Sequence, residues 1–188
     1  AIQYAFPTLA DTSRRVQKAL EAYTSANGEK AIVLFHSDAY EPKTAMQLHS
    51  NVLPIQVEEL ASVGSEIYLS ALTYGASQIV LMAETEIPTI SYDSLAEQVS
   101  WVRVILTELG MDPNQVSLQM EHEPIQILTT DLTIAISEMS VPNDKRKAFY
   151  QSLDHLVTQL NQKEVVAELP ANSAYGEVIV DSKNCTLC

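Results

Sequence analysis

The chain has 188 residues, of which 46% are hydrophobic and 19% charged, and this composition is typical of one globular domain with a buried core. A formal net charge of −13 argues against binding to nucleic acids or to anionic membrane surfaces, because both need clustered Lys and Arg. No apolar run approaches the roughly 18 residues of a membrane-spanning helix, so we expect no membrane insertion. With no signal-like segment and no disulfide framework, the expected location is the cytoplasm.

The chain begins with a helical pattern that leads into an apolar run. Asp11 or Thr12 can cap this first helix, and Asn27-Gly28 ends it. The residues at 31–35 are apolar without interruption, as in a strand that is buried on both faces of a parallel sheet.

A second strand over 52–57 contains Pro54, which has no N–H to donate to a neighbouring strand. We therefore expect this strand at an edge of the sheet or at a bulge. A helix over about 63–74 follows, with Gly75 ending it. The apolar run 78–82 predicts a third strand.

The longest predicted helix starts at a Ser91 cap and carries Trp101, which we expect in the core or at a domain contact. A fourth strand is predicted over 116–120. The following stretch, 125–136, is ambiguous, but its apolar residues fall at helical spacing and favour a helix. A last helix covers about 144–160.

Strands that alternate with helices indicate an α/β fold. We predict a three-layer sandwich with about four parallel strands, flavodoxin-like or Rossmann-like, in which right-handed crossovers place helices on both faces.

Ligands of such folds bind beyond the carboxyl ends of the strands, where this chain has several acids and histidines. Carboxylate oxygens suit a hard cation such as magnesium, calcium or manganese. Neighbouring carboxylates can also form an acid–base pair. The alternative is ordinary polar loops, which follow strands in any α/β protein. The residues of this predicted site are His36, Asp38, Glu58, Glu84, Glu121 and His122.

The loop before the second helix holds Gly64 and Ser65, whose N–H groups could bind a phosphate or carboxylate at a helix N-terminus. The alternative is that Ser62 caps the helix and Gly64 allows close packing against the sheet. The glycine-rich signatures of dinucleotide-binding and P-loop proteins are missing, so neither class is indicated.

The only two cysteines form a C-x-x-C at Cys185-Thr186-Leu187-Cys188. This spacing opens the bacterial iron–sulfur ligand run C-x₂-C-x₂-C-x₃-C-P. A zinc site would need two further ligands, and a thioredoxin-like pair would precede a long helix, so both are less consistent with the sequence.

Three segments resemble a known family. The chain starts with Ala1-Ile2, a pair that commonly follows the last cysteine of a ferredoxin cluster run, and the segments LPIQVEELASVG (53–64) and ALTYGA (71–76) are similar to the middle domain of proteobacterial 4Fe-4S dicluster ferredoxins. The resemblance implies that Cys185 and Cys188 ligate a [4Fe-4S] cluster in the full-length protein, with the other ligands outside these 188 residues. It also implies a redox partner, for which formate dehydrogenase is the candidate.

These expectations divide the chain into an α/β domain, 1–168, and a linker with the start of a truncated ferredoxin module, 169–188. The expected function is a non-catalytic scaffold and docking domain of an iron–sulfur electron-transfer protein, without a cluster in this fragment alone. The acidic charge fits docking to a basic partner. The alternative is a small-ligand- or metal-binding domain that uses the acids and histidines at the strand ends, and flavin is compatible with either function.

Overall fold

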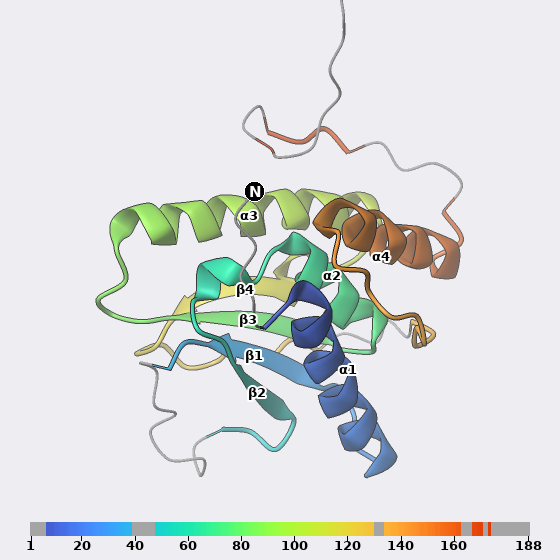
Figure 1. Ribbon diagram of the computed structural model, residues 1–188, viewed down its shortest axis with the longest axis horizontal. Coiled ribbons are helices and arrows are strands. Elements are labelled where there is room, and N and C mark those ends of the chain that lie inside the picture. The colour runs from blue at the N-terminus through green and yellow to red at the C-terminus, as the bar shows by residue number, and fades with distance from the viewer. Residues whose placement is uncertain (1–6, 39–47, 130–133, 163–166, 171–172, 174–188) are drawn as a thin grey trace, which may run out of the picture.

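The computed structural model describes residues 7–38, 48–129, 134–162, 167–170 and 173 (Figure 1). The predicted cluster ligands Cys185 and Cys188 lie outside the described residues. The helices and strands are, in chain order, α1 (Leu9–Ser25), β1 (Ile32–His36), β2 (Val52–Gln56), α2 (Ser65–Thr73), β3 (Gln78–Ala83), α3 (Thr89–Glu108), β4 (Val116–Met120) and α4 (Lys145–Gln159), with short 3-10 turns at Leu60–Ser62 and Pro113–Gln115.

The strands confirm the predicted α/β fold. In the described residues they form one four-stranded parallel sheet in the order β2-β1-β3-β4, which is the order of the first four strands of a flavodoxin-like sheet. Four helices accompany this sheet in the same residues, consistent with a three-layer α/β fold. Strand β2 lies at the edge, as its Pro54 predicts.

The helices pack on one face of the sheet. Side chains from α1, α2, α3 and α4 join Val33, Phe35 and Leu81 in a single apolar cluster. Helix α2 contacts the other three helices and lies between α1 and α4 in Figure 1. For α2 and α3 this placement is expected from right-handed crossovers, since the connections through them both advance in the same direction across the sheet.

The second face of the sheet carries a smaller apolar cluster that includes Ile32, Leu34 and Val80. In the described residues, its cover is made by Leu48 and Ile125, and neither residue is in a helix. The third layer is therefore non-helical where the structure describes it, in contrast to the helices that we expected on both faces.

Two helix starts differ from the prediction. Helix α1 begins at Leu9, because Thr8 and Asp11 form a capping box: the Asp11 N–H donates to Thr8 Oγ1 at 3.2 Å, and the Thr8 N–H donates to Asp11 Oδ2 at 3.2 Å. The Thr8 hydroxyl also donates to Asp11 Oδ2 at 2.6 Å, and this hydrogen bond, together with the one from the Thr8 N–H, holds the pKa of Asp11 below its usual value. Helix α3 begins at Thr89 behind Pro88, two residues before the expected Ser91 cap.

The helix favoured over 125–136 is wrong for its described part, where residues 125–129 and 134–136 are not helical. The polar groups of this segment pair with other elements instead. Gln78 holds its first part, donating from Nε2 to the Gln126 carbonyl at 2.7 Å and accepting from the Leu128 N–H at 3.2 Å. Farther on, Nε2 of His155 lies 2.8 Å from the Ala135 carbonyl oxygen. These long-range hydrogen bonds replace the i→i−4 bonds that a helix would need.

None of the helices in the described part of the chain is long and apolar enough to cross a membrane.

Candidate functional site

The carboxyl ends of the four described strands meet at one edge of the sheet. The register sets His36 of β1 level with Gln56 of β2 and Met82 of β3, and Ala83 level with Met120 of β4. The loops that carry the predicted site residues therefore leave the sheet along the same edge, next to the point between β1 and β3 where the strand order reverses.

Two of the predicted carboxylates are hydrogen-bonded to neighbouring hydroxyl groups. The buried Ser37 hydroxyl donates to Glu84 Oε1 across the β1–β3 boundary. Thr85 donates to Glu121 Oε1 from its N–H at 3.1 Å and from its hydroxyl at 2.6 Å. Thr85 was not among the residues that we expected at the strand ends. Each of these two acids is thus paired with a hydroxyl group, Glu84 with Ser37 and Glu121 with Thr85.

The other predicted residues differ in burial. His36 is buried, and its Nδ1 lies 2.8 Å from the carbonyl oxygen of Ser37. Asp38, Glu58 and His122 are exposed. Within the described residues, no three His, Cys, Asp or Glu side chains are grouped so that they could hold a metal ion.

Exposed acids line this edge of the sheet. Each of the four described strands is followed, within three residues of its end, by at least one of them. We call this group the acidic edge, and its members are Asp38, Glu58, Glu59, Glu86 and Glu123. A row of carboxylates on a chain with a net charge of −13 gives this side of the molecule a negative potential.

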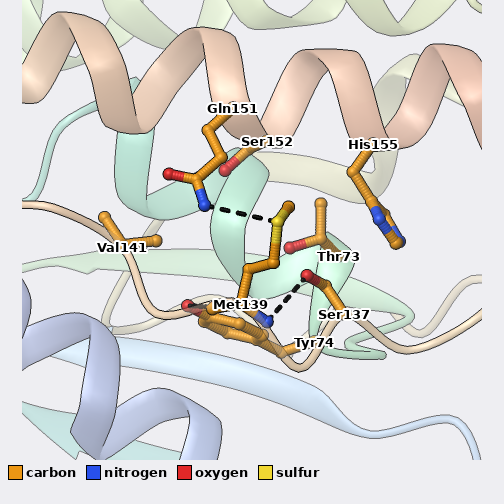
Figure 2. A pocket seen from close by; sticks show the side chains of 8 residues that line it. All are labelled: Thr73, Tyr74, Ser137, Met139, Val141, Gln151, Ser152 and His155. Carbon is orange, nitrogen blue, oxygen red and sulfur yellow. Dashed lines mark hydrogen bonds between the residues drawn. The ribbon is translucent and has the colours of Figure 1, made fainter.

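A small cavity lies between α2, α4 and the segment that precedes α4. Figure 2 shows Ser137 and Met139 of this segment between Tyr74 and helix α4, with Gln151 Nε2 donating to Met139 Sδ at 3.5 Å. The cavity volume is about 10 Å³, enough for one water molecule at most. Burial raises the pKa of Tyr74, whose hydroxyl is 3.1 Å from Ser13 Oγ. This region is a packing seam and has no room for a ligand.

A larger cleft, of about 300 Å³, opens where α2 and α4 begin. We call it the α2–α4 cleft. Its wall combines the first residues of both helices with the middle of α3. The lining residues are Gly64, Ser65, Glu66, Gln98, Trp101, Lys145 and Arg146.

Glu66 is the buried acid of this cleft, with 3% of its surface exposed. Its carboxylate is packed against Gly64, where a Cβ atom would collide with both of its oxygens. Lys145 Nζ lies 3.5 Å from Glu66 Oε1 and forms an ion pair with it. Gly64 therefore permits close packing against the Glu66 carboxylate, whereas the sheet was the packing partner that we expected.

Ser62, in contrast, does not cap α2. It ends a 3-10 turn, and its hydroxyl donates to the Glu59 carbonyl at 2.7 Å. Gly64 occupies the N-cap position of α2, without a side-chain hydrogen bond to the helix.

Next to the lining of the α2–α4 cleft, the buried Tyr68 of α2 contacts the lining residue Gln98. The Tyr68 hydroxyl donates to the Val63 carbonyl at 2.7 Å and lies 3.3 Å from Gln98 Oε1. Burial raises the pKa of Tyr68 far above its ordinary value, and the nearby Glu66 carboxylate raises it further, so the phenol stays protonated. Trp101 lies beside them and is 9% exposed.

Sequence reasoning found part of this cleft. The Gly64-Ser65 loop stands out as the start of a helix, and Trp101 is the only tryptophan of the chain. Nothing in the pattern, however, places Lys145 and Arg146 next to them, because the packing of α4 on α2 is a long-range contact.

No protein-family model matches this sequence, and no curated protein matches it either.

Proposed function

We propose that this chain is a non-catalytic docking and scaffold domain of a ferredoxin-type iron–sulfur electron-transfer protein. The observation that carries the proposal is the C-x-x-C of Cys185 and Cys188, the only cysteines of the chain. Its spacing is that of cluster ligands, which bind iron as thiolates. A [4Fe-4S] cluster takes four cysteines, so the remaining ligands of this cluster would come from outside these 188 residues.

The acidic edge supports the docking role. Its five carboxylates are exposed and come from the loops after all four described strands, so they can meet a broad basic surface at once. Complementary charge of this kind speeds the encounter of two proteins and fixes their orientation. Formate dehydrogenase, the partner that the ferredoxin resemblance suggests, is the protein with which we would test it.

Ligand or metal binding at the strand ends is the alternative function. It has less support, because Glu84 and Glu121 each accept a hydrogen bond from a neighbouring hydroxyl group.

Replacing both cysteines in the full-length protein should remove one cluster. Anaerobic purification of the wild type, followed by iron and acid-labile sulfide analysis, should show cluster iron, and the Cys185→Ser/Cys188→Ser variant should contain about four iron atoms fewer per molecule. Thr186→Ser, which keeps the cysteines and their spacing, is the control and should retain all of the iron. Equal iron in the wild type and the double variant would contradict the proposal, as would a wild type without iron.

Neutralising the acidic edge should slow electron transfer from the partner. With formate and formate dehydrogenase as reductant, the Glu58→Gln/Glu59→Gln/Glu86→Gln variant should be reduced about 3- to 10-fold more slowly at low salt, since steering by opposite charges is lost. The difference should shrink as salt screens the charges. The control variant Glu21→Gln/Glu29→Gln/Glu108→Gln removes three exposed acids elsewhere and should behave as the wild type. Equal rates for both variants would argue against docking at this edge.

A further inference from the structure

The α2–α4 cleft has a positive lining on a strongly acidic protein. Lys145 and Arg146 contribute two positive charges and Glu66 one negative charge, which leaves the lining at +1 while the chain carries −13. Helices α2 and α4 both begin at the cleft, so their partial positive ends also face it. The cleft is therefore suited to a small ligand that carries one carboxylate group.

Two buried polar atoms of the lining residues have no hydrogen-bond partner. They are Nε1 of Trp101, which is a donor, and Oε1 of Glu66, which is an acceptor. Trp101 is 9% exposed and Glu66 is 3% exposed. A buried polar atom without a partner costs about 1–3 kcal/mol, so such atoms call for an explanation.

The surroundings of Glu66 show how its free acceptor can be reached. Oε1 lies 3.5 Å from Lys145 Nζ, an ion pair that does not have the geometry of a hydrogen bond. The Lys145 side chain is 67% exposed, so it can move away without disturbing the core. Its movement would uncover the Glu66 carboxylate at the mouth of the cleft.

We propose that the α2–α4 cleft binds a small amino- or hydroxy-carboxylate. The ligand's carboxylate would accept from Trp101 Nε1 and pair with Lys145 and Arg146, while its amine or hydroxyl would donate to Glu66 Oε1. The volume of about 300 Å³ equals roughly ten water molecules and lies at the lower end of ligand pockets, as a molecule of this size requires. A phosphate dianion fits less well, because its second charge would face Glu66. This site is independent of the proposed docking function.

Trp101 makes the binding directly measurable. It is the only tryptophan of the chain, so the intrinsic tryptophan fluorescence reports on the cleft alone. We would titrate the protein with L-serine and L-lactate, and also with propionate, which lacks the donor, ethanolamine, which lacks the carboxylate, and inorganic phosphate, all at constant ionic strength. L-Serine or L-lactate should change the fluorescence saturably, and propionate and ethanolamine should bind at least tenfold more weakly.

Variants locate the binding in the cleft. Lys145→Gln/Arg146→Gln should weaken the binding of the preferred carboxylate at least tenfold, and Glu66→Gln should reduce the preference for that ligand over propionate. The control Lys18→Gln/Lys147→Gln removes the same charge from exposed positions outside the lining and should bind as the wild type. Thermal unfolding of each variant verifies that it is folded. The proposal is overturned if neither L-serine nor L-lactate gives saturable binding, if phosphate binds more tightly than both, or if the two double variants bind alike.

Discussion

Replacing Phe35 by alanine is expected to lower the free energy of unfolding by about 4 kcal/mol. Phe35 is fully buried in β1, and its strand neighbours are Ile55 of β2 and Leu81 of β3. Its ring belongs to the cluster that joins the sheet to all four described helices. Its removal loses the hydrophobic stabilisation of the buried ring. It also leaves a cavity that the close-packed neighbours on both sides cannot fill.

Urea unfolding followed by circular dichroism measures this loss. Since domains of this size are stable by about 5–15 kcal/mol, Phe35→Ala should lower the midpoint strongly or leave the protein partly unfolded. Ile90→Ala is the matched control: Ile90 is 80% exposed, and its replacement should change stability by less than about 0.5 kcal/mol. Similar stabilities for the two variants would show that the first face of the sheet does not carry the main core.

Phe35 also illustrates which parts of the fold the sequence predicts. The run 31–35 is apolar without a break, and only a strand covered on both faces buries every such side chain; the structure buries all of them. Pro54 predicts the edge position of β2 for an equally local reason, the missing N–H. The order of the inner strands β1 and β3 has no local cause, because it depends on which crossover passes over which strand.

The segment 125–136 shows where local patterns fail. Leu128 and Ala135 fall at helical spacing, yet the described backbone around them is not helical. The deciding partners are Gln78 and His155, which are distant in sequence. Apolar periodicity carries no information on such side-chain-to-backbone hydrogen bonds, so tertiary structure overrides it.

In the candidate sites, too, local patterns predict some features and long-range contacts decide the others. Parallel strands guarantee that the residues after β1, β3 and β4 share an edge, so the neighbourhood of Glu84 and Glu121 was predictable. Their hydrogen-bond partners Ser37 and Thr85 were not, since hydroxyl groups in loops carry no distinctive spacing. The α2–α4 cleft required the packing of two helices that are separated in the chain by β3, α3 and β4.

Replacing Gln78 by methionine is expected to release the segment that covers the second face of the sheet. Gln78 is 2% exposed at the start of β3, and its amide group makes two hydrogen bonds to residues 126–128 of this segment, one to the Gln126 carbonyl and one from the Leu128 N–H. Methionine has a similar length but neither group. The loss should be about 2 kcal/mol, since two partly buried backbone groups lose their partners.

Hydrogen exchange separates this local release from a general loss of stability. The Leu128 amide should exchange much faster in Gln78→Met. Strand β1 is paired on both sides within the sheet, so the exchange rates of its amides should change only as far as the global stability changes. Gln56→Met, at an exposed position of the edge strand β2, is the control and should leave the Leu128 amide protected. If the Leu128 amide exchanges equally slowly in both variants, the packing of Ile125 on the sheet holds the segment, and the two hydrogen bonds of Gln78 contribute little to its position.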